Sequence, residues 1–425
     1  MTHTSVRTAT ITDASSGSGA ADADRVARRG HNPASAEVAR RLLADIRELA
    51  PAITVRVAEI EAGRRIPLDL VDKLKSIGVF RMFAPRSHGG LELDLPEVLE
   101  ILGALGRVDG SVGWIAMVGG AGAIASSLLP RERYDRIYQN NPDVIFASSG
   151  QPAGTAEPAG DGWRVSGRWP FASGCQHADL IFALCVMAED GRPLPGPADG
   201  VPRIRGFFLP ARHWQIEDTW HAAGLKGTGS HHIALSDMLV PAANFIDLAS
   251  SVPCLPGPLY QALQHFAPLM LGAFASGVAG GALDELVELA NTGRRQQRAP
   301  APMRESEMFQ GEIGRVEAEL KAGRALLQVE AASHWGHALA GTLKGEALLK
   351  QGTQTGIWIT TTCVRAADAC FALGGSSALY ESSPLQRRLR DLHVAAQHAI
   401  VQQRHYAGSG KLLLDSSVGG AKIGD

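Results

Sequence analysis

Residues 162–179 read GWRVSGRWPFASGCQHAD, and this stretch decides what kind of fold the rest of the chain must surround. Trp163, Val165 and Gly167 alternate with charged or polar residues, and a period of two predicts a β-strand. Three further runs have the composition of strands and are separated by Gly and Pro turns: LIFALCVMA, RIRGFFLP and HHIALSDMLVP. We therefore predict a β-domain in the middle of the chain, over residues 144–250.

The sequence on both sides of this β-domain has the period of helices. Residues 35–143 place apolar residues such as Leu42 and Ile46 on one helical face. Residues 251–425 fit an antiparallel four-helix bundle, with candidate helices over Tyr260–Asn291, Glu305–Ala340, Lys344–Leu373 and Pro384–Leu414. Because helices and strands are segregated along the chain, we predict an α+β fold that is mostly α. Residues 1–34 are rich in small and polar residues and are predicted to be a disordered tail.

Composition and charge limit the possible functions. The 425-residue chain has a formal net charge of -2 and a pI of about 6.7, so it has no broad basic field for nucleic acid or an anionic membrane. Its five cysteines include no CxxC pair, which argues against a disulfide framework or a metal site and fits a reducing cytoplasm. Two uncharged stretches, Ser111–Pro130 and Phe266–Leu283, are long enough to suggest membrane spans. Their many Gly and Ala residues favour helices buried inside a soluble protein instead.

Two strings of small and hydroxyl-bearing residues are candidates for contact with a flat ligand. One follows the quoted strand and includes Ser173, and the other is GLKGTGS at residues 224–230. Small residues let the backbone approach a ligand, and hydroxyls can bond its polar edge. Ordinary turns between strands explain the second string equally well. A glycine-rich nucleotide loop is not predicted, because GAGAIA at residues 120–125 follows no strand and GSGK at residues 408–411 lacks the rest of a P-loop.

Several segments together resemble one protein family. These segments are SGRWPFASGCQHAD, GLKGTGS followed by DMLVP, PRSHGG, RVDGSVGW and PLQRRLRDLHVAAQH. Over residues 35–415 the chain is similar to the flavin-dependent monooxygenases that share the acyl-CoA dehydrogenase fold, which are oxygenase components of two-component systems. The resemblance implies a helical N-terminal domain, a middle β-barrel domain, a C-terminal four-helix bundle and a homotetramer.

The resemblance also implies roles for individual residues. Ser173 corresponds to a hydroxyl near the flavin N5 atom, and His398 to a histidine in the substrate pocket. The residues expected beside the flavin are Trp169, Phe171, Ser173, Leu225, Gly227, Thr228 and Ser230. Those expected to reach it across a subunit boundary are Arg298, Gly374 and Gly375. The expected substrate pocket contains Trp114, Gly122 and His398.

The implied activity is the insertion of one oxygen atom from O2 into an aromatic or heteroaromatic small molecule. In such enzymes reduced flavin forms a C4a-hydroperoxide, and a water-poor pocket slows its decay. Ser173 could supply a hydrogen bond at N5, and His398, which titrates near neutral pH, could remove a proton from the substrate. Reduced FMN or FAD is expected as a co-substrate from a separate NAD(P)H-flavin reductase, with no metal.

Two departures from the family pattern keep alternatives open. Phenol hydroxylases of the family often have a histidine where Gly122 stands, and its replacement indicates a pocket with room for a bulky, apolar substrate. Ala399 stands close to the glutamate position of many acyl-CoA dehydrogenases, so α-proton abstraction has no evident base. An FAD-containing acyl-CoA dehydrogenase-type oxidoreductase is the second hypothesis, and a non-catalytic helical scaffold is the third.

The sequence also suggests where three other histidines and Asp391 lie in the fold. His393 and His398 are five residues apart in the last candidate helix, so their side chains are expected to point about 140° apart. We therefore expect His398 in the pocket, His393 at the surface and no two-histidine metal site. Asp391 is expected to brace the bundle. His231 and His232 are adjacent in a strand and are expected to face opposite sides.

Overall fold

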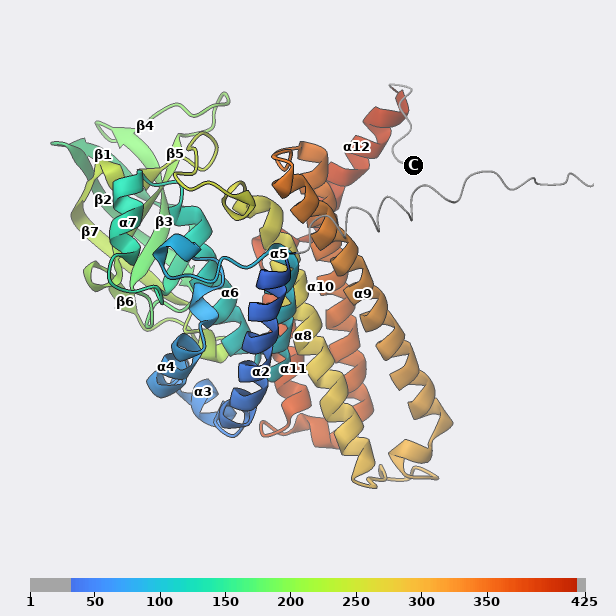
Figure 1. Cartoon of the computed structure of the whole chain (residues 1–425). Helices are drawn as coiled ribbons and strands as arrows, with labels where there is room; N and C mark the ends of the chain where they lie inside the picture. Colours follow the sequence, from blue (N-terminus) through green and yellow to red (C-terminus); the bar gives the residue numbers. More distant parts are fainter. Residues whose placement is uncertain (1–31, 419–425) are drawn as a thin grey trace, which may run out of the picture.

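The computed structural model describes residues 32–418, with a sheet at one side, short helices beside it and long helices on the far side (Figure 1). The helices that precede the sheet are α2 (Pro33–Thr54), α3 (Val57–Gly63), α4 (Leu68–Ser76), α5 (Leu95–Val108), α6 (Gly110–Ser126) and α7 (Arg131–Tyr138). Helix α5 packs against the long helices, whereas α6 contacts both them and the sheet. The first helical group therefore lies between the other two parts of the molecule.

Helix α6 separates the sheet from the long helices, and its sequence explains where it begins and why it is buried. The Asp109 carboxylate caps the helix by accepting the backbone N–H groups of Ser111 and Val112 at 2.9 and 3.0 Å. Gly113 packs so closely on α5 that a Cβ there would lie 2.7 Å from the backbone nitrogen of Gly106. Because α6 is apolar on all sides, most of its residues are buried, as predicted for this uncharged stretch.

The sheet occupies the middle of the chain and is open. Its strands are β1 (Phe146–Ala159), β2 (Gly162–Ala172), β3 (Leu180–Glu189), β4 (Arg192–Pro193), β5 (Ile204–Pro210), β6 (Gln215–Glu217), β7 (His231–Pro241) and β8 (Phe245–Ile246). They pair in the order β6-β7-β2-β1-β3-β5-β8 with β4 beside β3, and only β1 and β3 are parallel. Among residues 32–418 the end strands β6 and β8 do not pair with each other, so the expected barrel is corrected to an open sheet. These strands have three and two residues.

The stretch quoted first forms β2 and then bends sharply. The register of β2 against β7 shifts between Trp169 and Ala172, and Phe171 adopts a left-handed backbone with φ 62°. An irregularity of this kind redirects the side chains around it. Trp169 points into the core of the sheet, whereas the side chain of Phe171 is 57% exposed. Ser173 follows the bend and lies against α6.

The long helices form a bundle of α8 (Leu263–Asn291), α9 (Glu307–Leu339), α10 (Glu346–Gly374) and the shorter α11 (Pro384–Ala395). Helix α8 packs against α5, α9, α10 and α11, so it is the central helix. Within the described part of the chain, α8 alone is long and apolar enough to cross a membrane, yet 89% of its most apolar window is buried inside the protein. This burial confirms the prediction of an internal helix.

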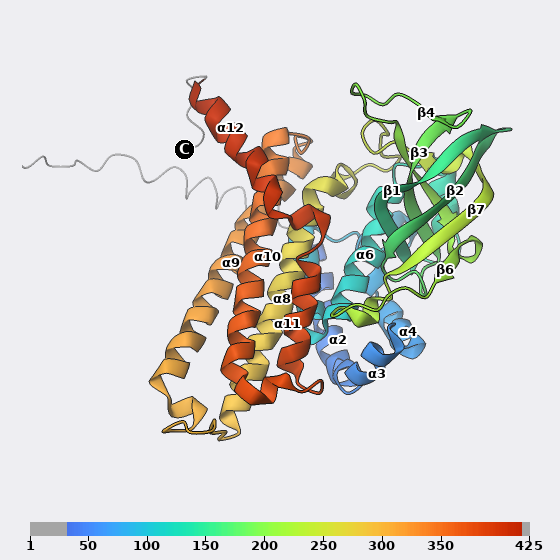
Figure 2. The same cartoon turned by 180° about the vertical axis from the view of Figure 1, so that it is seen from behind.

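The predicted last helix, Pro384–Leu414, is wrong in its middle. The chain leaves the bundle after Ala395, forms two short 3-10 turns over Ala399–Val401 and Gln403–His405, and enters α12 (Tyr406–Val418). Helix α12 extends beyond the other helices at one end of the bundle (Figure 2). His398 therefore stands outside any helix, with φ -62° and ψ 135°, and the angle expected between it and His393 does not apply.

Side chains replace the helical hydrogen bonds that are lost at this break. The amide of Gln402 donates to the carbonyl oxygen of Ala396 at 3.1 Å. The ring nitrogen Nε2 of His405 donates to the carbonyl oxygen of Ala399 at 2.8 Å. No Gly or Pro marks the break in the sequence.

Candidate active site

Three hydroxyl groups and an indole form a continuous network where the sheet meets α6. Trp114, in α6, donates from Nε1 to Ser173 Oγ at 3.0 Å. Ser173 Oγ lies 2.7 Å from Ser230 Oγ, which lies 2.7 Å from Thr228 Oγ1. Thr228 Oγ1 donates to the carbonyl oxygen of Leu225 at 2.7 Å. We call these five residues the hydroxyl network, which joins four of the predicted flavin residues to one of the predicted pocket residues.

His398 and Phe274 pack around the ring of Trp114. The centroid of the His398 ring is 5.7 Å from that of Trp114 at an interplanar angle of 66°, and Phe274, in α8, is 5.4 Å away at 80°. Both are edge-to-face arrangements, which aromatic rings prefer. The structure therefore brings Trp114 and His398 together. Phe274 was missed, because nothing in the sequence distinguishes it from other apolar residues of its helix.

The surroundings of His398 determine where its hydrogen lies. Burial lowers the pKa of His398, which favours the neutral ring. Its Nδ1 atom accepts the backbone N–H of Ile400 at 3.3 Å. A nitrogen that accepts cannot also carry hydrogen, so the neutral ring in this orientation carries its hydrogen on Nε2. His398 is therefore a hydrogen-bond donor, and uptake of a second proton at Nδ1 requires the bond to Ile400 to break.

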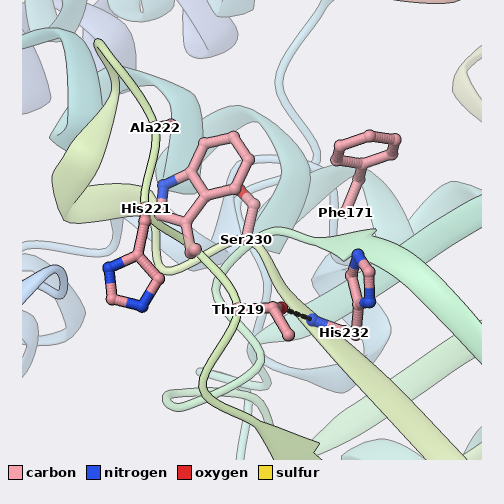
Figure 3. A pocket seen from close by; sticks show the side chains of 7 residues that line it. Phe171, Thr219, His221, Ala222, Ser230 and His232 are labelled. Atoms are coloured by element: carbon pink, nitrogen blue, oxygen red, sulfur yellow. Dashed lines mark hydrogen bonds between the residues drawn. The ribbon is translucent and has the colours of Figure 1, made fainter.

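A pocket of about 150 Å³ opens beside the hydroxyl network (Figure 3). It is lined by the end of β2, the start of β7 and the loop between β6 and β7, through Phe171, Thr219, Trp220, His221, Ala222, Ser230 and His232. Phe171 and Ser230 are two of the predicted flavin residues. Sites that enclose a drug-sized ligand measure roughly 300–1,000 Å³. This pocket can therefore hold only part of a molecule as large as a flavin.

His231 holds the loop between β6 and β7, which lines the pocket, in place. Its Nδ1 atom accepts the backbone N–H groups of Thr219 and Trp220, both at 3.2 Å. His232 lines the pocket, and its backbone N–H donates to Thr219 Oγ1 at 2.8 Å (Figure 3). The two histidines thus face opposite sides of the strand, as expected. The role of His231 was missed because both of its partners are backbone groups, which carry no sequence signal.

Asp391 connects the bundle to the hydroxyl network. Its Oδ1 atom accepts the backbone N–H of Leu225 at 2.6 Å. Leu225 is buried and has φ 49°, a conformation that side-chain-bearing residues rarely adopt, so the carboxylate stabilises an unfavourable backbone. Burial, together with the nearby Asp109 carboxylate, raises the pKa of Asp391 to about 7. Asp391 therefore braces the GLKGTGS segment against the bundle.

Trp169 was expected beside the flavin, and its position corrects this expectation. The side chain is completely buried in the core of the sheet. Its Nε1 atom donates to the carbonyl oxygen of Leu184 at 2.6 Å, and its ring packs edge-to-face on Trp214 at 5.2 Å. A side chain enclosed in this way stabilises the sheet and cannot touch a ligand.

Gly122 and Gly227 face protein rather than open space. A Cβ on Gly122 would lie 2.1 Å from Cγ of Phe146. The expectation that Gly122 enlarges a substrate pocket is therefore wrong, because the Phe146 ring fills that volume. A Cβ on Gly227 would lie 2.2 Å from Cγ2 of Ile60, so Gly227 permits close packing on α3.

The segments of Arg298, Gly374 and Gly375 are not part of this pocket. The end of α10 and the loop between α8 and α9 lie at the end of the bundle away from the sheet (Figures 1 and 2). The Gln296 amide joins these two segments by donating to the carbonyl oxygen of Leu373 at 2.8 Å. Within one chain, Arg298 and the two glycines therefore do not line the pocket.

Comparisons with known proteins agree with this architecture. Models of the acyl-CoA dehydrogenase N-terminal and C-terminal domains match residues 36–129 and 269–403. Indole-3-acetate monooxygenase from Acinetobacter baumannii is 32% identical over 368 residues, which is 85% of this chain and 89% of that protein. The flavin-dependent monooxygenase oxygenase subunit HsaA from Rhodococcus jostii is 28% identical over 359 residues, 83% and 92% of the two chains.

A solved structure extends this likeness to three dimensions. XiaF from Streptomyces, in complex with FADH2, matches with a TM-score of 0.81 and 25% identity over 92% of this chain and 98% of its own. The sheet that follows one helical group and precedes another along the sequence, the two domain models and the relatives all point the same way. The chain belongs to the flavin-dependent monooxygenases that share the acyl-CoA dehydrogenase fold.

Proposed function

We propose that this protein inserts one oxygen atom from O2 into an aromatic or heteroaromatic small molecule, with reduced FMN or FAD as co-substrate. The observation that carries the proposal is the convergence of Ser173, Trp114 and His398 at α6, between the sheet and the bundle. Flat apolar walls with a few polar groups are typical of small-molecule sites. A relative that is an indole-3-acetate monooxygenase supports a heteroaromatic substrate. Reduced flavin, when bound, supplies the redox chemistry.

The residues around the pocket fit a flavin. Phe171 offers an exposed ring, whose centroid is 6.4 Å from that of Trp220 and 6.5 Å from that of His232. Ser173 and Ser230 offer oxygen atoms for the polar edge of the ring system. Leu225 and Thr228 shape the same side through the hydroxyl network. These groups would hold the flat ring between apolar side chains and limit its contact with water.

His398 is proposed to contact the substrate. From Nε2 it can donate a hydrogen bond to a polar atom of the substrate and so orient the ring that is oxidised. Removal of a substrate proton by His398 would follow only after the Ile400 bond breaks, because Nε2 already carries a hydrogen. Burial lowers the pKa of His398 below its usual 6.5, so activity that depends on the neutral ring persists in mildly acidic solution.

A separate NAD(P)H-dependent reductase is proposed to supply the reduced flavin, which accords with the words "oxygenase subunit" in the name of the Rhodococcus relative. We further propose a homotetramer, in which the α8–α9 loop and the end of α10 reach the flavin of another subunit. The separation of these segments from the pocket within one chain supports this arrangement. The free state of all five cysteines is compatible with a cytoplasmic location.

The proposal is tested by mixing the protein with chemically reduced FMN or FAD, O2 and a panel of indoles and phenols. We expect an oxygenated product that contains one atom from labelled O2. His398→Ala should lower the yield of this product by roughly tenfold, the loss expected for one hydrogen bond to the substrate, and leave flavin binding nearly unchanged. His393→Ala is the matched control, because His393 is exposed and bonds Asp368 at 2.8 Å.

Two outcomes would contradict these assignments. Equal yields from His398→Ala and the parent protein would remove His398 from the mechanism. The absence of product with every substrate, combined with reduction of bound FAD by an acyl-CoA, would replace the monooxygenase proposal with the dehydrogenase hypothesis.

A further inference from the structure

One face of α6 is apolar and partly accessible to solvent. Most residues of this helix are buried, but Val118 and Ala121 are only partly covered. They stand four and seven residues after Trp114, so the three side chains share one face of the helix. Trp114 joins this face to His398 and Phe274, whose rings pack against its indole. We call Trp114, Val118 and Ala121 the α6 stripe.

The two helices that meet at Trp114 bring no charge to this stripe. Helix α6 contains no acidic or basic residue over its whole length. Helix α8, which carries Phe274 and packs on α6, has no acidic or basic residue before Asp284 other than His265. Asp284 follows Phe274 by ten residues, which is about 15 Å along a helix axis. An ion beside Trp114 would therefore find no opposite charge on either helix.

The segment that carries His398 also offers no cation. Within residues 392–402 only His393 and His398 can be charged, and exposed His393 is bonded to an aspartate of α10. The lowered pKa of His398 has burial as its cause, without a contribution from a charged group of the described chain. Arg365 of α10 acts on Tyr406 instead. His398 is therefore a neutral hydrogen-bond donor in uncharged surroundings.

The charged side chains at the start of α6 are already paired with one another. Arg388 bonds Glu285 and three carbonyl oxygens at the end of α5. Arg387 lies between Asp109 and Glu285, at 3.9 and 4.0 Å. The carboxyl of Asp391 lies near that of Asp109. Three acidic groups and two arginines meet here, which leaves no positive charge over for an anionic ligand.

We propose that the substrate is a neutral aromatic molecule with a hydrogen-bond acceptor for His398, and that the α6 stripe selects against anionic analogues. A carboxylate buried along this stripe would lose its hydration and gain no ion pair. A neutral carbonyl or hydroxyl oxygen can accept the hydrogen on Nε2 of His398. This inference rests on the proposed function, because it takes Trp114 and His398 to contact the substrate.

The test compares pairs of compounds that have nearly the same shape and differ in charge. The ring is the one that the panel of indoles and phenols shows to be oxygenated. For an indole the pair is indole-3-acetamide and indole-3-acetate, and for a phenol it is 4-hydroxyphenylacetamide and 4-hydroxyphenylacetate. We measure kcat/KM at pH 8 with reduced flavin and O2, or the inhibition constant where a compound is not oxygenated. The amide should be favoured by at least roughly a hundredfold, because an unpaired charge is costly to bury.

The pH dependence of this preference gives a second measurement. Simple carboxylic acids have a pKa of about 4.3, so a larger fraction of the acid is neutral as the pH falls. The preference for the amide should shrink to roughly tenfold or less at pH 5. Effects of pH on the protein act on both members of a pair and cancel in their ratio.

Val118→Arg adds a permanent cation to the α6 stripe at a partly exposed position. It should lower the preference for the amide at pH 8 by about tenfold, chiefly through better use of the acid. Val118→Met is the matched control, because it lengthens the side chain without a charge and should leave the preference nearly unchanged.

The outcomes separate this inference from the proposed function. Equal values for acid and amide in the parent, or a folded Val118→Arg protein that keeps the preference of the parent, would overturn the inference and leave the proposed function intact. The absence of oxygenated product from every indole and phenol would overturn the proposed function itself.

Discussion

Two buried polar groupings in this molecule are organised in opposite ways. In the hydroxyl network the indole and all three hydroxyls are hydrogen-bonded in series. A second grouping, which we call the bundle cluster, lies among α8, α9 and α10 and consists of His265, Glu330, His334 and Gln351. The rings of its two histidines are 6.2 Å apart, and Gln351 donates to Glu330 Oε1 at 2.9 Å. Three of its atoms, His265 Nδ1, His334 Nε2 and Glu330 Oε2, have no hydrogen-bond partner within residues 32–418.

The difference shows that burial of polar groups is not enough to build a site. In the hydroxyl network the donors and acceptors are fixed in order. Thr228 donates to the carbonyl oxygen of Leu225, so Ser230 must donate to Thr228 and Ser173 to Ser230, which lines the pocket. The bundle cluster has no such connection, and each buried polar atom without a partner costs roughly 1–3 kcal/mol. Substitutions that remove polar atoms should therefore lower the free energy of unfolding when made in the hydroxyl network and raise it when made in the bundle cluster.

The largest effect is expected at Asp391, which supports the network through Leu225. Its pKa rises from the ordinary 3.8 to about 7 through burial and the neighbouring Asp109, and Arg387 and Glu61 also face it. Between about pH 4 and 7 the native state keeps a proton that the unfolded state releases, so stability falls as the pH rises, by at most ~4 kcal/mol. Asp391→Asn still offers an acceptor to Leu225 and should be more stable than the parent at pH 8.

Urea unfolding of the parent and variant at pH 4.5 and pH 8 measures this difference. Asp391→Ala is the control, because it removes the acceptor as well as the charge. It should be less stable than Asp391→Asn at both pH values by about 1–3 kcal/mol. Identical pH profiles for the parent and Asp391→Asn would show that this carboxyl does not titrate differently in the native state.

A somewhat smaller effect of opposite pH dependence is expected at His265 in the bundle cluster. Burial and the neighbouring His334 lower the pKa of His265 from 6.5 to about 4. Below pH 6.5 the unfolded state takes up a proton that the native state refuses until about pH 4, so stability falls as the pH decreases, by at most ~3 kcal/mol. His265→Leu removes this loss and should raise the free energy of unfolding most at pH 4.5.

The same urea titrations test His265→Leu, with the exposed His213→Leu as a matched control that should show little effect. A variant at His265 that is less stable than the parent at every pH would mean that this ring supports the bundle. The contrast between the two polar groupings would then be wrong.

The smallest effect is expected from two matched tryptophan substitutions. Trp114→Phe keeps a ring against His398 and removes the N–H that Ser173 accepts, so it should cost about 0.5–1.5 kcal/mol of unfolding free energy. Trp335 in α9 is also buried, but its Nε1 atom has no hydrogen-bond partner in the part of the chain described. Trp335→Phe should therefore cost less at pH 7, and equal losses would show that the network bond contributes nothing.

Local patterns were enough to predict much of this molecule. The alternation around Trp163 predicted β2, and the uncharged stretches predicted the buried helices α6 and α8. The period and composition of a segment depend only on residues that are close in sequence, so they can be read without knowledge of the fold. The family resemblance then selected Ser173 and His398 from among many residues of the same kinds, and the structure brings both against Trp114.

What local patterns could not predict depends on partners far along the chain or on side chains without a distinctive sequence. The small size of Gly122 was plain, but the Phe146 ring that fills the space beside it was not. The sequence suggested that Trp169 contacts a ligand. The bulge after Trp169 exposes Phe171 and leaves Trp169 buried. The helix break before His398 is stabilised by Gln402 and other side chains that carry no breaker signal.

The bond between Leu225 and Asp391 also governs when the site can form during synthesis. These residues are 166 positions apart, whereas Trp114 and Ser173 are separated by 59 and Ser173 and Ser230 by 57. Distant pairings close late, and a polypeptide leaves the ribosome N-terminus first. A nascent polypeptide that has not yet reached Asp391 contains every hydroxyl of the pocket but lacks the group that holds Leu225 in its left-handed conformation. The bond that holds Leu225 can therefore form only after α11 has been translated.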